Sequence, residues 1–317
     1  MQNPIQIAGL IKEKAKELGL LECAILPVEH LDEEKEHFQS WLENRMHGEM
    51  DYMARNIEKR IDPSLLFESA KTIIVVLQNY FPQKMQMDQS APVLSKYAYG
   101  TDYHFVLKDK LKSLLAFIQK EIQPCNGRAF VDSAPVLERA WAKRAGLGWV
   151  GKNSNIISVE HGSFFFIAEL ILDIELPFDE PKLVNDYCGK CTRCIDACPT
   201  KAIVADRVID ARKCISYQTI EVKGNLDESL KGNFENRVFG CDICQDVCPW
   251  NLKSEKNNEP EFTPNQKLME LSKDDWHKME KPLFDEIFKK SAVKRTGYSG
   301  LKRNLNFIES GKDGNKI

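Results

Sequence analysis

The chain has few of the features that direct a protein into or across a membrane. It contains no apolar run of the roughly 18 residues that a membrane-spanning helix needs. Its N-terminus also lacks the unbroken apolar stretch of a signal peptide, because Lys12, Glu13 and Lys14 interrupt it. We therefore expect a cytoplasmic protein that has no membrane partner and keeps its thiols reduced.

The chain also lacks a strong excess of charge, and its histidines are not spaced as metal ligands. Its formal net charge is −3, from 44 Lys and Arg and 47 Asp and Glu residues, so any nucleic acid must be held by a local patch. None of its six histidines forms an HxxxH or HxH pair, which argues against a histidine metal site. Its 317 residues, 43% of them hydrophobic and 29% charged, indicate about two globular domains.

Cysteine is concentrated in one part of the chain, where eight of the ten cysteines lie between residues 188 and 248. The first four follow the pattern C-x2-C-x2-C-x3-C-P, one stands alone, and the last three follow C-x2-C-x3-C-P. The first pattern is typical of bacterial proteins that bind two [4Fe–4S] clusters. Zinc normally takes two C-x2-C pairs, and disulfide frameworks belong mostly to much smaller secreted domains, so both are weaker interpretations.

The spacing also divides the eight cysteines between two clusters. In the bacterial pattern the cysteine before proline binds the other cluster, and the isolated Cys214 is the only candidate that completes four plus four ligands. The expected sets are Cys188, Cys191, Cys194 and Cys248 for one cluster, and Cys198, Cys214, Cys241 and Cys244 for the other. The two remaining cysteines, Cys23 and Cys125, lie in apolar settings and are expected to be buried small hydrophobic residues.

Hydrophobic periodicity predicts a mixed region of helices and strands before the cysteines. The expected helices are 5–19, 34–44, 105–121 and 135–145, the expected strands are 21–27, 72–80 and 127–133, and 155–158 and 163–174 are expected to form a hairpin. The predicted fold class is an α/β (α+β) N-terminal domain with a ferredoxin-like domain for two [4Fe–4S] clusters. The predicted domains are 1–178, 179–260 and a short helical, basic segment at 261–317, with a first boundary near 177–181.

The stretch GLGWVG at 146–151 matches the dinucleotide pattern G-x-G-x-x-G and nearly matches a phosphate-binding loop. Both matches fail on context, because a strand should precede such a loop, whereas here a helix is expected to end at Gly146. The pattern is therefore interpreted as a glycine helix stop followed by a turn. A role for Lys152, Asn153 and Ser154 toward another anionic or amide-rich ligand stays open.

Asp132 is the most interesting acidic residue of the first domain. It lies at the carboxyl end of the predicted strand and just before a predicted helix, and open α/β sheets bind ligands at that edge. Its alternative role is a helix cap beside Ser133.

Several segments resemble one known family, epoxyqueuosine reductase, the cobalamin-dependent iron–sulfur enzymes that finish queuosine in tRNA. The segments are HGEMDYM (47–53), KRIDPSLLF (59–67), KYAYGTDYH (96–104), FVDSAPVLERAWAKRAGLGWVGKNSN (130–155), CISYQTIE (214–221) and FGCDICQDVCPWN (239–251). The resemblance extends to about residue 305. Many members carry an additional C-terminal segment of helical repeats, and little of this chain follows Asn304 to form one.

The resemblance implies a two-electron, two-proton reduction that removes an epoxide oxygen as water and leaves an alkene. Electrons would pass from a small reductant protein, such as a ferredoxin or flavodoxin, through the clusters to cobalamin. The family binds cobalamin without a protein histidine, in agreement with the absence of a D-x-H-x-x-G loop. Asp132 matches the family acid, and its burial against the corrin and the substrate is expected to raise its pKa and keep it protonated near neutral pH. The residues implied to contact the corrin are Arg60, Tyr97, Asp132, Lys152, Asn153, Ser154, Gln218 and Asp242.

A basic stretch offers a surface for the tRNA substrate. Residues 287–308 contain no Asp or Glu, and they include Lys289 and Lys290. The residues expected to contact the phosphates of an anticodon stem-loop are Lys294, Arg295, Lys302 and Arg303. The protein is expected to act as a monomer.

Interpretations from other functional classes remain open at this point. A plain ferredoxin-type electron carrier would need only the cysteine domain, which leaves the first 180 residues without a purpose. A reductive dehalogenase-like corrinoid iron–sulfur enzyme shares the two-cluster plan but usually carries an export signal, which this chain lacks. Clusters that only brace a nucleic-acid-binding protein would leave Asp132 unexplained.

Overall fold

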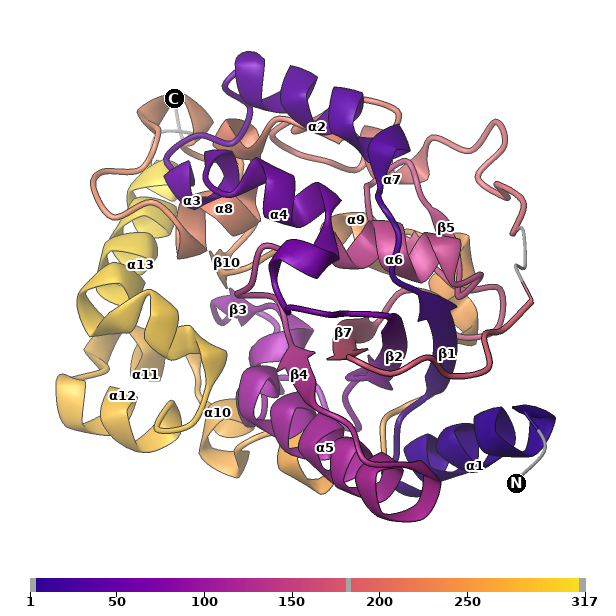
Figure 1. Ribbon diagram of the computed structural model, residues 1–317. Helices are drawn as coiled ribbons and strands as arrows, with labels where there is room; N and C mark the ends of the chain where they lie inside the picture. The colour runs from indigo at the N-terminus through magenta and orange to yellow at the C-terminus, as the bar shows by residue number, and fades with distance from the viewer. Residues whose placement is uncertain (1–3, 181–183, 314–317) are drawn as a thin grey trace.

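A four-stranded antiparallel sheet organises the N-terminal half of the protein. The computed structural model describes residues 4–180 and 184–313 (Figure 1). The strands lie in the order β1 (Glu22–Pro27), β2 (Thr72–Asn79), β7 (Phe165–Leu172) and β4 (Gly127–Phe130), and all neighbouring pairs are antiparallel. The central strand β2 is the apolar run TIIVVLQN, which fits a strand that is covered on both faces.

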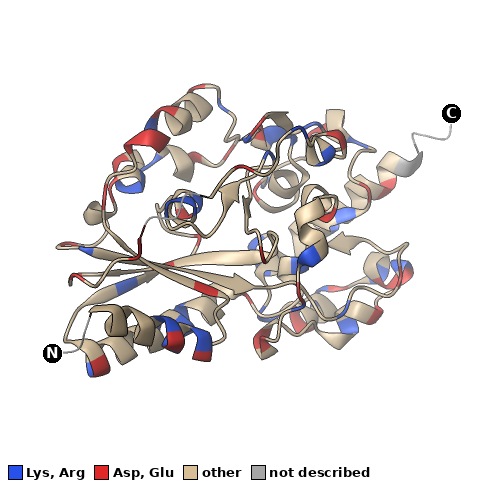
Figure 2. Ribbon diagram, turned by 90° about the vertical axis from the view of Figure 1, so that its right-hand side faces the viewer, with Lys and Arg blue, Asp and Glu red and all other residues tan. Residues whose placement is uncertain are grey.

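Helices cover both faces of this sheet. α1 (Pro4–Glu17) and α5 (Tyr103–Phe117) lie on one face and α6 (Glu138–Arg144) lies on the other, and this half of the chain also forms α2 (Asp32–Glu43), α3 (Asp51–Ala54) and α4 (Ile57–Ile61). Alternate residues of a strand point to opposite faces. Ile74 and Val76 therefore pack against α1 and α5, whereas Ile73 and Val75 pack with Trp141 of α6. Figure 2 shows the sheet between these layers.

The cysteine-rich part folds around two short helices of the same design. α7 (Arg193–Asp196) follows Cys191 and carries Cys194, and α9 (Ile243–Asp246) follows Cys241 and carries Cys244. The other elements here are β8 (Ile203–Ala205), β9 (Val208–Ile209), α8 (Ile215–Ile220) and β10 (Arg237–Phe239), which pairs in parallel with β3 (Val93–Leu94). A further pair, β5 (Trp149–Val150) and β6 (Ile156–Ile157), lies between the two halves of the chain.

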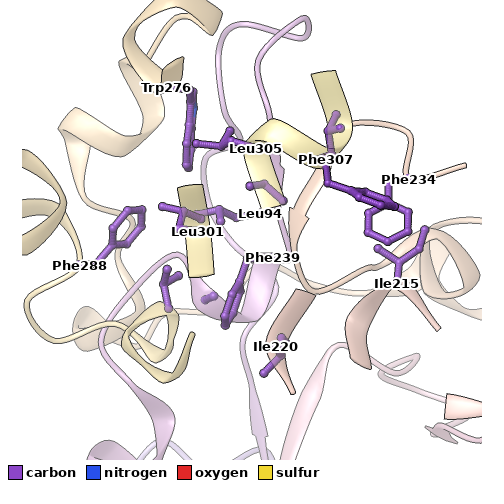
Figure 3. Packing of buried hydrophobic residues seen from close by; sticks show 14 of the residues in the cluster. Leu94, Ile215, Ile220, Phe234, Phe239, Trp276, Phe288, Leu301, Leu305 and Phe307 are labelled. Carbon is purple, nitrogen blue, oxygen red and sulfur yellow. The ribbon is translucent and has the colours of Figure 1, made fainter. Parts of the chain in front are cut away.

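The last helices pack onto the cysteine-rich part rather than forming a separate unit. They are α10 (Gln266–Glu270), α11 (Lys273–Lys278), α12 (Lys281–Ile287) and α13 (Gly297–Asp313). Figure 3 shows Trp276 and Leu301 in one buried cluster with Leu94, Ile215 and Phe239. The limits of the three expected domains stay a prediction, but this core is continuous across residue 260.

Most elements expected from periodicity are confirmed. Helices α1 and α2 and strands β1 and β2 lie within two residues of the expected ranges, and α5 is extended by a π-helical turn at Ile118–Ile122. Gly146, with φ of 68°, ends α6 as expected, and the strand β5 follows. Within the described ranges, no helix combines the length and apolar character that crossing a membrane requires.

Three local expectations were wrong. The helix expected from Pro135 begins only at Glu138, because the residues before it form a turn. The expected hairpin of 155–158 with 163–174 is reduced to one antiparallel bridge between Ser158 and Gly162, since β6 pairs with β5 and β7 pairs with β2 and β4. The sheet is also antiparallel, so the ligand-edge rule for open α/β sheets is not the reason for the position of Asp132.

Asn304 ties α13 to the cysteine-rich part. Its fully buried amide donates hydrogen bonds to the backbone carbonyls of Thr219 and Val238, both at 2.9 Å. We expect Asn304→Ala to lower the free energy of unfolding by about 2–4 kcal/mol, because two buried acceptors lose their donor. Denaturant unfolding followed by circular dichroism checks this. Asn306→Ala, at an exposed position of the same helix, is the control and should change stability by less than about 0.5 kcal/mol.

Candidate functional site

The structure gathers the cysteines into two neighbouring sets. Cys188, Cys191, Cys194 and Cys248 line one cavity, together with Trp250. The other set is evident in the electrostatics of its thiols. Burial raises the pKa of the Cys244 thiol well above its usual value, and Cys241 and Cys214 raise it further. Burial also raises the pKa of Cys214, with a contribution from Cys198. Both groupings coincide with the sets expected from spacing, whose assignment as ligands stays a prediction.

The sulfur spacing does not suit zinc. In the described part of the chain, no three cysteine sulfurs lie within 4.8 Å of one another. Ligands of a tetrahedral zinc at Zn–S of about 2.3 Å would lie only about 3.8 Å apart. All ten cysteines are free, so there is no disulfide framework either. The wider arrangement suits a larger inorganic group held between four thiolates.

Aromatic side chains enclose the first set, a feature that sequence reasoning missed. The Trp149 indole donates a hydrogen bond from Nε1 to Cys188 Sγ at 3.4 Å. The rings of Trp149, Tyr187 and Trp250 lie 5.0 to 5.6 Å apart, centroid to centroid. Trp149 is buried but Tyr187 is 47% exposed, so these rings shield the set from water in part, and the N–H···S bond stabilises the negative charge on sulfur. Trp149 belongs to the GLGWVG stretch (146–151), which the sequence analysis interpreted from its glycines alone.

Asp132 lies just past the end of β4, in a strained turn. Its φ of 52° is left-handed, which is uncommon for a non-glycine residue and often marks a functional site. Glu138, at the start of α6, holds this turn, because its carboxylate accepts the backbone N–H of Asp132. The Asp132 side chain itself is 54% exposed.

Two neighbours on α5 hold the Asp132 carboxylate. The Tyr103 hydroxyl donates to Asp132 Oδ2 at 2.8 Å, and His104 Nε2 lies 3.4 Å from the same oxygen. The other ring nitrogen, His104 Nδ1, lies 2.8 Å from Asp102 Oδ1. The Tyr103 ring stacks on Phe166 with centroids 4.1 Å apart, so the hydroxyl is fixed in direction. Tyr103 and His104 end the segment KYAYGTDYH (96–104), which resembles the family, but the sequence pattern alone did not indicate a role for them.

These neighbours lower the pKa of Asp132 in the structure. Burial raises the pKa of Asp132, but hydrogen bonds from His104 and Tyr103 and the His104 charge outweigh it and hold the pKa below its usual value. Burial lowers the pKa of His104, but hydrogen bonds and charges from Asp102 and Asp132 raise it to about 9. The expectation of a raised pKa assumed burial against the corrin and the substrate, and it stays a prediction for that complex. Near neutral pH the proton lies on His104.

Two further acidic residues lie behind the turn. Burial, with the Asp132 charge, raises the pKa of Glu138 to about 8. Glu169, on β7, is fully buried, and neither of its carboxylate oxygens has a hydrogen-bond partner among the described residues. Burial, followed by Glu138 and Asp132, raises the pKa of Glu169 well above its usual value. Near neutral pH both groups are thus neutral acids, and the negative charge of the site is concentrated on Asp132.

Tyr97 and Arg60 are two of the residues implied to contact the corrin. Tyr97 is half-buried, and burial, followed by the Asp132 charge, raises its pKa. Arg60 is 6% exposed and donates from one terminal nitrogen to the Tyr52 carbonyl at 3.0 Å. Its Nε is buried and, within the described residues, has no hydrogen-bond partner. A buried, unpaired donor at this position fits a ligand rich in carboxamide acceptors, such as the rim of a corrin.

The other implied corrin contacts have partners within the protein. Lys152 lies 3.3 Å from Asp206 and, with Asn153, lines the cavity of the first cysteine set. The hydroxyl of Ser154 donates to the Arg207 carbonyl at 2.6 Å.

The remaining two implied contacts lie on the cysteine-rich side. Gln218 donates to the Arg212 carbonyl at 2.6 Å and accepts from the Asp227 N–H at 3.2 Å. Asp242 is buried and accepts from Ser95 and Lys96. Their roles toward a corrin stay predictions.

The basic residues expected to contact RNA are of two kinds. Lys294 is exposed, and Arg295 is 46% exposed beside Glu221 at 2.9 Å. Lys302 instead donates to the His277 carbonyl at 2.7 Å, and Arg303 donates to the carbonyls of residues 222 and 224. Figure 2 shows basic and acidic positions mixed over the ribbon, so any basic surface is local.

Comparison with known proteins covers nearly the whole chain. A family model described as a 4Fe-4S double cluster binding domain matches residues 187–251, and one described as epoxyqueuosine reductase QueG, DUF1730, matches residues 60–133. The chain is 52% identical over 302 residues to the epoxyqueuosine reductase of Cellulophaga algicola, covering 95% of this chain and 98% of the relative. It is 41% identical over 313 residues to that of Escherichia coli (strain K12), covering 96% and 82%.

A solved structure extends this similarity to the fold. A crystal structure of epoxyqueuosine reductase with a tRNA-Tyr epoxyqueuosine-modified stem loop superposes with a TM-score of 0.88 at 30% identity, and covers 98% of this chain and 82% of that one. The structure of a reductive dehalogenase, NpRdhA, superposes with a TM-score of 0.50 at 17% identity. The match covers 97% of this chain and 38% of the dehalogenase, and it indicates a shared fold alone.

The isolated Cys214 gives a direct test of the ligand sets. Anaerobically prepared protein should contain about eight iron and eight sulfide per chain, the content of two [4Fe–4S] clusters. We expect Cys214→Ser to lose about half of both, because only the second set needs this thiolate. Iron and acid-labile sulfide assays check the loss. Cys125→Ser, outside both sets, is the control, and stoichiometric zinc without sulfide would contradict the assignment.

Proposed function

Because this chain belongs to the epoxyqueuosine reductase family, we propose that it reduces epoxyqueuosine to queuosine at the wobble position of tRNA. The observation in the site that best supports this chemistry is Asp132, a half-exposed carboxylate that a tyrosine and a histidine hold at the end of β4. The reaction adds two electrons and two protons, breaks both C–O bonds of the epoxide, and releases an alkene and water. A plain electron carrier loses its support, since the relatives match 95% of the chain rather than the cysteine window alone. A dehalogenase loses its support as well, because the likeness to one is limited to the fold.

Two [4Fe–4S] clusters and cobalamin are the cofactors of this reaction. The two cysteine sets adjoin, since Cys194 contributes to the pKa of Cys244, so electrons can pass from one cluster to the other. Cys241 and Cys244 of the second set flank Asp242, which binds the segment that carries Tyr97. This supports the order first cluster, second cluster, corrin.

Cobalamin, when bound, supplies a strongly reduced cobalt that passes the electrons to the substrate. Arg60, through its unpaired Nε, and Tyr97 are the residues that would hold the corrin rim. Asp132 would deliver the proton that the opening epoxide oxygen needs, and Tyr103 orients its carboxylate.

Electrons would enter at the first cluster. A surface groove reaches Cys248 and is lined by Arg193, Ala197, Val247 and Leu252, the last of which is 83% exposed. A small reductant protein, such as a ferredoxin or flavodoxin, is the proposed donor there. A cytoplasmic location is part of the same proposal, because tRNA is modified in the cytoplasm. A monomeric state is proposed as well.

The anticodon stem-loop would lie against the exposed basic residues near the start of α13. Arg295 contributes to the pKa of Asp132, so this surface begins close to the site of the chemistry. Lys289, Lys290 and Lys294 extend it. Lys302 and Arg303 are left out of this surface, because they bind backbone carbonyls of the protein.

Asp132→Asn should keep both clusters and cobalamin yet lose turnover by about 10²- to 10⁴-fold, because the amide keeps the shape but cannot supply the proton. Cofactor content is measured by absorption spectra and turnover by conversion of epoxyqueuosine in a stem-loop. The matched control is Asp109→Asn, an exposed position on α5. Turnover of Asp132→Asn near that of the parent would assign Asp132 to the turn alone.

Charge reversal tests the RNA surface. We expect Lys289→Glu/Lys294→Glu to weaken stem-loop binding and to reduce the slope of log affinity against log salt by about 1.4–1.8, the value for two lost phosphate contacts. Lys112→Glu/Lys120→Glu is the control with the same change of charge, because Lys112 is exposed on α5 and Lys120 is exposed on the π-helical turn that follows it. An unchanged slope in the first variant, or free nucleoside reduced as efficiently as the stem-loop, would show that the surface is wrong.

A further inference from the structure

Asp132 cannot supply both protons of a turnover by itself. The proposed reaction consumes two protons, whereas one carboxyl group holds one, so the donor must be reloaded before the product leaves. A bound substrate would cover the exposed side of Asp132. The second proton must then come from a group behind the carboxylate that also reaches water.

His104 meets both conditions. Its Nε2 lies 3.4 Å from Asp132 Oδ2, and its Nδ1 lies 2.8 Å from Asp102 Oδ1, so the ring bridges two carboxylates. The His104 side chain is 22% exposed, and it lies on α5, while Asp132 lies on the turn after β4. Asp102 accepts the backbone N–H of His104 at 3.0 Å as well, so one carboxylate caps the helix and fixes the ring.

We propose that Asp102, His104 and Asp132 form a proton relay, in which His104 acts through Asp132 and reloads it from solvent once in each turnover. This inference rests on the proposed reduction of epoxyqueuosine. The step balances: the proton shared by His104 and Asp132 moves through Asp132 to the substrate oxygen. It leaves a neutral imidazole and a carboxylate, and the imidazole then takes a proton from water. Asp102 stays ionised throughout and stabilises the imidazolium.

The charges around the relay come from four elements. Asp102 caps α5 itself, Asp132 lies on the turn after β4, Glu138 begins α6, and Arg295 lies just before α13. The carboxylates of Asp102 and Asp132 favour the charged ring, and the resulting pKa of about 9 keeps the relay loaded at neutral pH. The proton is bound below that value and is lost as the pH rises through it. Glu138, whose pKa is about 8, is the one competing donor among these groups.

The relay is tested by the pH dependence of single-turnover reduction of epoxyqueuosine in a stem-loop, from pH 6 to 10, with cluster and cobalamin absorbance measured for each variant. The wild-type rate should fall above about pH 9. In His104→Gln the proton must reside on Asp132 alone. The rate at pH 8 should therefore fall at least about 100-fold and recover about tenfold for each unit of acidification.

Asp102→Asn is the conservative variant, because asparagine also caps helices and keeps a hydrogen-bond acceptor for the ring. It removes one negative charge, so the alkaline limb should move down by about 1–2 pH units, and the loss of rate should be smaller at pH 6 than at pH 8. A loss in His104→Gln that is the same at every pH would mean a structural role and overturn the relay. If the alkaline limb of the pH–rate profile shifts in Glu138→Gln and not in His104→Gln, the proton belongs to Glu138 instead.

A second readout does not depend on activity. Nitrogen-15 labelling of the six histidines, with His104 assigned from His104→Gln, gives the titration midpoint of its ring by NMR. The midpoint should lie near 9 in wild type and fall in both Asp102→Asn and Asp132→Asn. A wild-type midpoint near 6.5 would overturn the relay. If the wild-type protein does not reduce epoxyqueuosine, the proposed function fails, while the NMR midpoints still decide whether the three groups share a proton.

Discussion

One buried carboxylate, that of Asp242, connects the two halves of the site. It lies between Cys241 and Cys244, is 1% exposed, and accepts hydrogen bonds from the Ser95 hydroxyl and from the Lys96 backbone N–H at 2.8 Å. The Lys96 ammonium, also buried, lies 3.4 Å from it and forms a second ion pair with Asp246. Removing one partner of a buried pair typically costs about 3–5 kcal/mol, because a charge is left without compensation. Since Tyr97 follows directly, the position of the second cluster and that of the chemistry around Asp132 are set by the same interaction.

Three acidic residues of the N-terminal domain have different pKa values because they differ in burial and in hydrogen bonding. Glu169 is fully buried and has no hydrogen-bond donor within residues 4–180 and 184–313, so burial keeps it neutral. Glu138 has one backbone donor, and its pKa is raised to about 8. Asp132 has Tyr103 and His104, and it is ionised. Of the three, Asp132 is the charged carboxylate, and it lies where the substrate needs a proton. Its counter-charge is the protonated ring of His104, which carries a proton that Asp132 can pass on.

Sequence patterns predicted what depends on neighbouring residues along the chain. Periodicity located β2 and α5, and cysteine spacing proposed ligand sets that coincide with the groupings in the structure. The patterns failed where the partner is distant in sequence. The strand β7 pairs with β2 and β4 instead of its near neighbour β6. The pKa of Asp132 likewise depends on His104, which lies 28 positions earlier in the chain. The position of Asp132 was expected for a reason that an antiparallel sheet does not support.

The basic stretch near the C-terminus shows why a count of charges overestimates a binding surface. Residues 287–308 carry no acidic residue, yet Arg295 is neutralised from another element by Glu221, and Arg303 uses both of its hydrogen-bonding edges on carbonyls near α8 and on Asn304. These bonds hold α13 on the same core that contains Phe239, next to Cys241. A guanidinium that satisfies several carbonyls is difficult to release for a phosphate, because each acceptor would then be left unpaired. Part of the positive charge therefore stabilises the fold near the second cysteine set, and the lysines that remain exposed are free to attract RNA.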